Sequence, residues 1–287
     1  MTTPEPAAIR GRGGESASAR TRGRPEFKDD GIVLRTYRLG ESDKILRVLT
    51  RENGKRSAVG KGVRKTSSRF GARLEPLTHV KLFLHRGRSM DTVKQAEIIN
   101  SFQEVRDDLD LFVAASSMAE LVDFITEEGE PNPELFELLL LGLQLLKEYP
   151  SRSPLVLALF QFKVMAQAGF ELMVTRCASC AGEPGDEVWF SLALGGVVCE
   201  RCRAGRAAES GRLVKLSPPA SGTLRWMSSS RLGEWPPGLD DSPSAEVRAL
   251  MSKVLEHWME REFRSHRVAK AMPAPAGDEI GGQGNGR

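Results

Sequence analysis

All four cysteines of this 287-residue chain fall into one motif, and that motif constrains the fold more than any other feature. Cys177 and Cys180 form one pair, Cys199 and Cys202 form a second, and 18 residues separate the two pairs. The pattern C-x2-C-x18-C-x2-C has the spacing of a zinc site. Two residues between paired cysteines let a tight turn aim both sulfurs at one point, and a second such turn completes a tetrahedron.

We therefore predict that Cys177, Cys180, Cys199 and Cys202 hold one structural zinc ion. Four thiolates leave no open coordination position, so the metal would stabilise a small folded module rather than catalyse a reaction. A hairpin within residues 188–199 would bring the two pairs together. Free cysteines, disulfides and an iron–sulfur cluster are the alternatives, the last because four thiolates also bind iron.

Charge is distributed unevenly along the chain, although the formal net charge is only +3. Residues 28–94 contain 17 Lys and Arg against 7 Asp and Glu, whereas residues 95–287 contain 19 against 28. A basic front part joined to an acidic back part is typical of proteins that bind nucleic acid.

The two ends of the chain have the composition of disordered segments. Residues 1–27 and 272–287 are rich in Gly, Pro, Ala and polar residues, so we expect both to be disordered. The first segment has no apolar core of the kind found in signal peptides, and no apolar run in the chain reaches the ~18–20 residues of a membrane span. We expect a cytoplasmic protein without a membrane partner, and a reducing compartment favours metal binding over disulfides.

Residues 28–102 are predicted to form a small β-barrel. Turn residues separate five runs of strand length, at residues 31–39, 43–50, 55–62, 79–87 and 90–99. The pair Asn53-Gly54 between two of the runs is a strong hairpin signal, because both residues tolerate positive φ. Five short strands with closely spaced turns favour the barrel of oligonucleotide- and oligosaccharide-binding (OB) proteins.

Helical periodicity replaces the strand pattern after the barrel. Residues 103–173 are predicted to form a helical bundle, with carboxylates at Asp107, Asp108 and Asp110 in a first turn rather than in a metal site of a nuclease. The cysteine module, residues 174–205, is inserted before a C-terminal helical part, residues 206–271, that packs on the bundle. The fold class is therefore α+β, with several domains.

Basic side chains of the barrel and of the connector at residues 63–76 are the predicted nucleic-acid contacts. Their cations would neutralise phosphates and release counterions, although a solvated basic face would have the same composition. The predicted contacts are Arg35, Lys44, Arg47, Lys55, Arg56, Lys61, Arg64, Lys65, Arg69 and Arg73. Phe70 lies among them, and we expect it to pack in the core rather than to stack on a base.

Several segments resemble the RecO family of bacterial recombination mediators and DNA repair proteins. They are residues 31–35 (GIVLR), 40–45 (GESDKI), 60–62 (GKG) and 74–77 (LEPL). The order of a helical bundle, a four-cysteine module and a last helix also resembles the family, so that the likeness covers about residues 28–270. Some members of the family lack the cysteines, which this chain has.

The resemblance implies a non-enzymatic role on DNA at the nucleoid. Family members bind single- and double-stranded DNA and anneal complementary strands. With the partner RecR they help load RecA onto strands coated by single-stranded-DNA-binding protein, whose acidic C-terminal tail they recognise.

Two other classes of protein carry a similar cysteine module. One is a zinc-containing DNA-processing enzyme that resembles certain glycosylases, and the other is a zinc-ribbon transcription factor. Cleavage or base excision would identify the enzyme, and sequence-specific binding would identify the transcription factor. A phosphate-binding P-loop is not indicated, because five residues separate Gly54 from Gly60 and no Ser or Thr follows Lys61.

Overall fold

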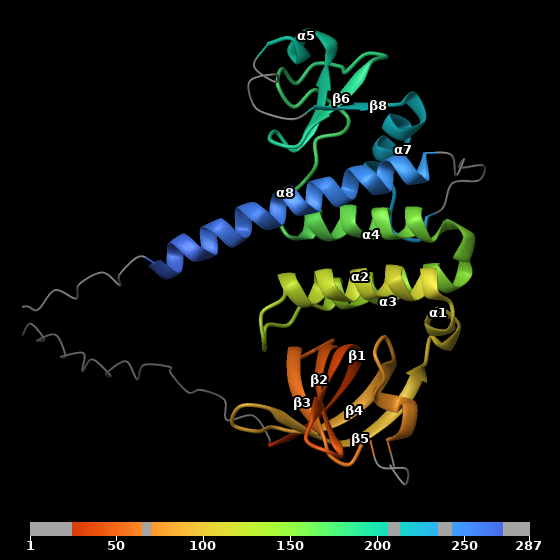
Figure 1. Ribbon diagram of the computed structural model, residues 1–287, viewed down its shortest axis with the longest axis vertical. Helices are drawn as coiled ribbons and strands as arrows, with labels where there is room; N and C mark the ends of the chain where they lie inside the picture. Colours follow the sequence, from red (N-terminus) through yellow and green to blue (C-terminus); the bar gives the residue numbers. More distant parts are fainter. Residues whose placement is uncertain (1–24, 65–69, 206–212, 235–242, 272–287) are drawn as a thin grey trace, which may run out of the picture.

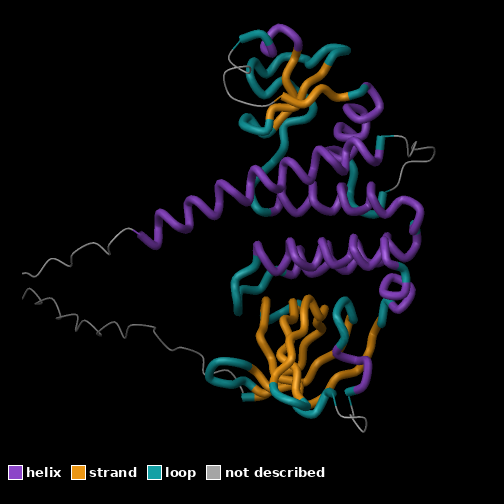
Figure 2. The backbone as a smooth tube through the Cα atoms, viewed as in Figure 1, coloured by secondary structure: helices purple, strands orange, loops and turns teal. Residues whose placement is uncertain are grey.

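The long helices of the molecule lie between two separate units that contain its strands (Figure 1). The computed structural model describes residues 25–64, 70–205, 213–234 and 243–271, and for residues 244 and 260–271 it describes the backbone alone. Most of the two predicted disordered segments, residues 1–24 and 272–287, lies outside these ranges. Figure 2 shows strands at the two ends of the molecule and helices in the layer between them.

The first unit is a closed five-stranded barrel, as the sequence predicted. Its strands are β1 (Glu26–Leu39), β2 (Asp43–Thr50), β3 (Gly54–Gly60), β4 (His79–His85) and β5 (Asp91–Asn100). They close in the order β1-β2-β3-β5-β4, with a parallel contact between β3 and β5 and antiparallel contacts elsewhere. This topology confirms the OB-type barrel.

The barrel interior confirms the predicted role of Phe70, which is 2% exposed and packs with Leu46, Val80 and Leu84. The strand β1 begins earlier than expected, because Glu26 and Phe27 fall in the segment predicted to be disordered. Phe27 stays ordered because it pairs with Leu84 across the sheet and packs against the barrel core.

The hairpin between β2 and β3 packs closely against residues 129 and 130, which lie in a connection between two of the helices. Gly54 has φ of +68°, and a Cβ atom there would lie 2.2 Å from the main-chain oxygen of Glu130. The next residue, Lys55, accepts a main-chain hydrogen bond of 2.8 Å from Gly129. The glycine is therefore needed both for its positive φ and for this close approach.

Helices α1 (Gln103–Asp107), α2 (Leu109–Ile125), α3 (Pro133–Glu148) and α4 (Ser153–Gln167), with the short helix η2 (Pro150–Arg152), follow the barrel. They share one extensive core, into which apolar residues of the barrel also pack. These elements confirm the predicted bundle.

The start of α2 confirms the structural interpretation of the aspartates. The carboxylate of Asp108 accepts a hydrogen bond of 3.0 Å from the main-chain nitrogen of Leu111, and Asp110 lies in the first turn. Both positions suit the positive end of the helix dipole. Asp107, by contrast, is the last residue of α1.

The cysteine module contains more structure than the sequence indicated. The predicted hairpin consists of β6 (Val188–Ser191) and β7 (Gly196–Cys199), and α5 (Glu200–Arg203) follows it. A third strand, β8 (Leu213–Leu216), pairs with β6 and lies beyond the predicted boundary at residue 205. The module therefore includes the start of the segment that was predicted to be helical.

Two further helices complete the chain. The first, α7 (Pro218–Ser229), begins with two prolines, and the hydroxyl of Ser217 caps it by accepting a 3.2 Å hydrogen bond from the main-chain nitrogen of Ala220. The last helix, α8 (Ser244–Ala271), packs along α4 (Figure 1). Within the part of the chain that the structure describes, no helix is both long enough and apolar enough to cross a membrane.

Candidate metal centre and nucleic-acid interface

The four cysteines converge on one point, as the sequence predicted. Their sulfur atoms all lie within 4.8 Å of one another, and the sulfurs of Cys180 and Cys199 are 3.9 Å apart. Sulfurs around a tetrahedral zinc ion with Zn–S of about 2.3 Å are separated by about 3.8 Å. The cluster therefore needs only small shifts to hold zinc.

Two turns present the sulfurs. The first turn is closed by a main-chain hydrogen bond of 2.8 Å from Ala181 to Cys177, and Ala181 has φ of +59°. The second turn begins at the end of β7 and continues into α5, which carries Cys202. Gly196 lets β7 approach the segment that leads into the first turn, because a Cβ atom at this position would lie 2.6 Å from the main-chain oxygen of Met173.

The thiols of the cluster differ strongly in acidity. Burial alone would raise the pKa of Cys177, but hydrogen bonds from the main-chain nitrogens of Cys199, Cys180 and Ser179 lower it to about 6. A hydrogen bond to Ser179 tends to lower the pKa of Cys202, whereas the neighbouring sulfurs raise it to about 12. The thiol of Cys177 therefore loses its proton readily, whereas the neighbouring sulfurs oppose the loss of the proton from Cys202. A bound divalent cation would favour the thiolate form of both.

Three of the ten predicted nucleic-acid contacts are instead directed at the helices. Lys55 lies 3.2 Å from a carboxylate oxygen of Asp123, Arg47 lies 3.4 Å from the same carboxylate, and Arg35 lies 2.8 Å from Glu120. Lys55 is 5% exposed, so it cannot reach a phosphate while the barrel and the helices remain packed. The sequence could not indicate this pairing, because Asp123 is 68 residues away in the chain, and a contact of Lys55 with nucleic acid stays a prediction.

Two more of the predicted contacts are neutralised within the barrel. Lys44 pairs with Glu75 at 2.9 Å. Arg56 donates two hydrogen bonds, of 2.8 and 2.9 Å, to the two carboxylate oxygens of Asp91, and this contact raises the pKa of Arg56. Such a bidentate pair fixes the short parallel contact between β3 and β5.

The other five predicted contacts remain candidates for phosphate binding. Lys61, Arg64 and Arg73 are exposed, and Arg64 also donates a hydrogen bond of 3.3 Å to the main-chain oxygen of Gly40. Lys65 and Arg69 lie outside the described residues.

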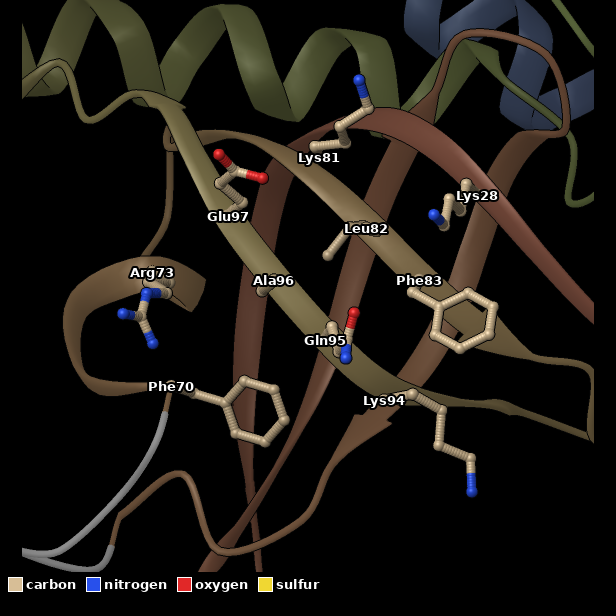
Figure 3. Close-up of a pocket in the computed structure, with 10 residues that line it drawn as sticks. All are labelled: Lys28, Phe70, Arg73, Lys81, Leu82, Phe83, Lys94, Gln95, Ala96 and Glu97. Atoms are coloured by element: carbon tan, nitrogen blue, oxygen red, sulfur yellow. The ribbon is translucent and has the colours of Figure 1, made fainter.

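The structure adds basic residues that the sequence analysis did not single out. Lys28, Lys81 and Lys94 line an open pocket on the outer face of the barrel, together with Arg73 and the ring of Phe83 (Figure 3). The signal in the sequence is weak, because these lysines are far apart in the chain and meet only when β1, β4 and β5 pair.

The fold and the cysteine cluster define a class of protein, an OB-type barrel joined to a helical bundle and a four-cysteine metal module. Comparison of the sequence with models of protein families identifies the family within this class. The model for the N-terminal part of recombination protein O matches residues 24–102, and the model for its C-terminal part matches residues 106–269. The chain therefore belongs to the RecO family.

Curated relatives agree with this assignment. The chain is 39% identical over 245 residues to the DNA repair protein RecO of Frankia casuarinae, and this match covers 84% of the chain and 97% of the relative. It is 36% identical over 247 residues to the protein of the same name from a Nocardioides species, and this match covers 83% of the chain and 97% of the relative. It is 34% identical over 262 residues to the DNA repair protein RecO of Rubrobacter xylanophilus, and this match covers 91% of the chain and 98% of the relative.

Proposed function

We propose that the chain is a DNA repair and recombination mediator that works by binding rather than by catalysis. In this proposal it binds single- and double-stranded DNA in the cytoplasm, at the nucleoid, and anneals complementary strands. Together with RecR it helps load RecA onto strands coated by single-stranded-DNA-binding protein, and it recognises the acidic tail of that coating protein. Membership of the RecO family over most of the chain is the observation that carries the proposal.

The charge of the barrel supports the proposed annealing. Residues 28–94 carry 17 basic against 7 acidic side chains. Even with several of these cations engaged in ion pairs, a basic surface screens the repulsion between two phosphate backbones and raises the encounter rate of complementary strands. Exposed cations such as Lys61 and Arg64 lie at one end of the barrel, where a strand can reach them.

The proposed zinc ion would have a structural role in this protein. Cys177, Cys180, Cys199 and Cys202 supply four thiolates, and a zinc ion that has four protein ligands has no position left for water or substrate. The ion would hold the two turns together at the end of the three-stranded sheet. Zinc binding would then stabilise the fold of the cysteine module and fix the shape of its surface.

An annealing experiment tests the proposal. Labelled complementary strands, each coated by single-stranded-DNA-binding protein, are mixed with the full chain without nucleotide and magnesium, and the products are also run on a denaturing gel. We expect duplex formation to accelerate and both strands to stay intact, while non-complementary strands give no duplex. Cleaved or base-excised strands would instead support the enzyme alternative, and unchanged duplex formation would refute annealing.

A further inference from the structure

An open pocket of about 470 Å³ lies on the outer face of the barrel, away from the ion pairs with the helices. It is formed by β1, β4, β5 and the short helix η1 (Gly71–Leu74). Figure 3 shows the side chains that line it, which are Lys28, Phe70, Arg73, Lys81, Leu82, Phe83, Lys94, Gln95, Ala96 and Glu97. Buried residues form its floor, and charged residues surround it.

Strand register places the exposed lining residues in two rows. Lys28 of β1 is opposite Phe83 of β4, and Phe83 is opposite Gln95 of β5, so these three side chains lie side by side across the sheet. In the next row, Lys81 is opposite Glu97. Because side chains alternate along β4, Lys81 and Phe83 point outward while Leu82 between them is buried.

A β-bulge directs a further cation onto this face. Phe83 pairs with Gln95 and the next residue of β4 pairs with Val93, so that Lys94 has no partner in the register. A bulge lets two neighbouring residues face the same side, and Lys94 and Gln95 are indeed both exposed. Without the bulge, one of the two would point into the barrel.

Three lysines of this pocket make no ion pair among the described residues, unlike the cations that face the helices. Within the described ranges, no carboxylate lies within ion-pair distance of Lys28, Lys81 or Lys94. Among the residues that line the pocket, these three lysines face a single carboxylate, that of Glu97. The pocket therefore attracts anions, even though Asp30 is opposite Lys81 in the neighbouring strand.

The ring of Phe83 supplies an apolar surface between these charges. Phe83 is half-buried and belongs to none of the hydrophobic core clusters among the described residues. The ammonium of Lys28 lies 6.0 Å from the centre of the ring. An aromatic face within a cluster of cations suits a base that stacks while its phosphates meet the lysines.

We infer that this pocket binds a segment of single-stranded nucleic acid. One base stacks on Phe83, and the flanking phosphates contact Lys28, Lys81, Lys94 and Arg73. A single strand fits better than a duplex, because the face of a paired base is covered by its neighbours. The inference rests on the proposed function and assigns the strand-binding site to the face that β1, β4 and β5 form beside Arg73 of the connector.

Charge removal in the full chain tests the assignment. The variant Lys28→Ala/Lys81→Ala/Lys94→Ala is compared with a control that removes three exposed cations from the helices, Arg225→Ala/Arg248→Ala/Lys253→Ala. Fluorescence anisotropy of a labelled oligothymidylate, measured over a range of salt concentrations, gives the affinity. We expect the pocket variant to bind at least about tenfold more weakly, with a salt slope flatter by about 0.7 for each lost contact, and the control to bind within about twofold of the parent.

Two further variants separate the role of the pocket from general effects on folding. Lys28→Arg/Lys81→Arg/Lys94→Arg keeps the charge and should restore most of the binding. Phe83→Leu keeps an apolar side chain but loses the ring, so we expect about fivefold or more weaker binding of single strands and little change for duplex DNA. Urea unfolding of each variant verifies that the barrel is intact.

The outcomes distinguish this inference from the proposed function. If the pocket variant binds single strands as tightly as the parent does, the site lies elsewhere but DNA binding stands. If the parent itself does not bind, the proposed function fails. If the pocket variant loses affinity for an acidic peptide but keeps its affinity for oligothymidylate, the pocket is a peptide site and the inference is overturned.

Discussion

The ammonium group of Lys55, on strand β3 of the barrel, lies 3.2 Å from the carboxylate of Asp123, on helix α2, and also donates a hydrogen bond to the main-chain oxygen of Asp123. The Lys55 side chain is 6% exposed and that of Asp123 is 14% exposed. Two guanidinium groups, those of Arg47 and Arg35, lie 3.4 and 3.8 Å from the same carboxylate. One aspartate thus neutralises a cluster of barrel cations where the barrel meets the helices.

Asp123→Asn should destabilise the protein strongly. The substitution leaves the buried ammonium of Lys55 without its counter-charge, and breaking a buried pair by removing one partner costs about 3–5 kcal/mol. Lys55→Met is the matched comparison, because Asp123 then keeps Arg47 and Arg35 and the buried site becomes apolar. Urea unfolding should show the larger loss for Asp123→Asn, and an equal or smaller loss would contradict the role assigned to this carboxylate.

Arg56→Lys should lower stability without weakening DNA binding. A lysine cannot reproduce the two hydrogen bonds to Asp91, so we expect a loss of about 1–2 kcal/mol in the free energy of unfolding. Affinity for single-stranded DNA should stay within about twofold, since the guanidinium is already occupied. A marked loss of affinity at unchanged stability would return Arg56 to the DNA interface.

The sequence predicts elements with strong local signals. The five strands, the turn at Gly54 and the helix cap at Asp108 all depend on residues near one another in the chain. Helix α7 lies within residues 206–271, which the sequence predicts to be helical, and Ser217 before two prolines is a helix-start signal.

Which cations remain free could not be predicted from the sequence. The pairing of Lys55 depends on Asp123, which is 68 residues away in the chain. The pocket at Lys28, Lys81 and Lys94 depends on the register of three strands and on one bulge. Both arrangements arise only from the tertiary fold, whereas the spacing of the four cysteines carries its own geometric information.

Metal removal should unfold the cysteine module before it affects the barrel. We expect elemental analysis to give about one zinc per chain. Chelation should change the fluorescence of Trp189, on strand β6, because zinc binding provides folding free energy for the small sheet. Added zinc should restore the signal and added magnesium should not. Folded protein without zinc, or with iron and visible absorption, would contradict the assignment.

His79 should make the protein less stable in mild acid. Burial lowers the pKa of His79, with Arg51 acting in the same direction and Asp30 opposing it. The unfolded chain therefore takes up a proton near pH 6.5 while the folded protein resists it, so stability falls as the pH decreases below about 6.5. In His79→Gln, the free energy of unfolding should fall less between pH 7.5 and pH 5.5, and an unchanged slope would show that another group is responsible.

The salt dependence of single-strand binding by the parent protein tests the central claim most directly, which is that the chain acts on DNA through charge and binding. Anisotropy of a labelled oligothymidylate should give a straight line of log K against log salt. With three or four phosphate contacts, its slope should be about −2 to −3. The same line should be obtained with and without nucleotide. Binding that does not depend on salt, or no binding at low salt, would contradict the account.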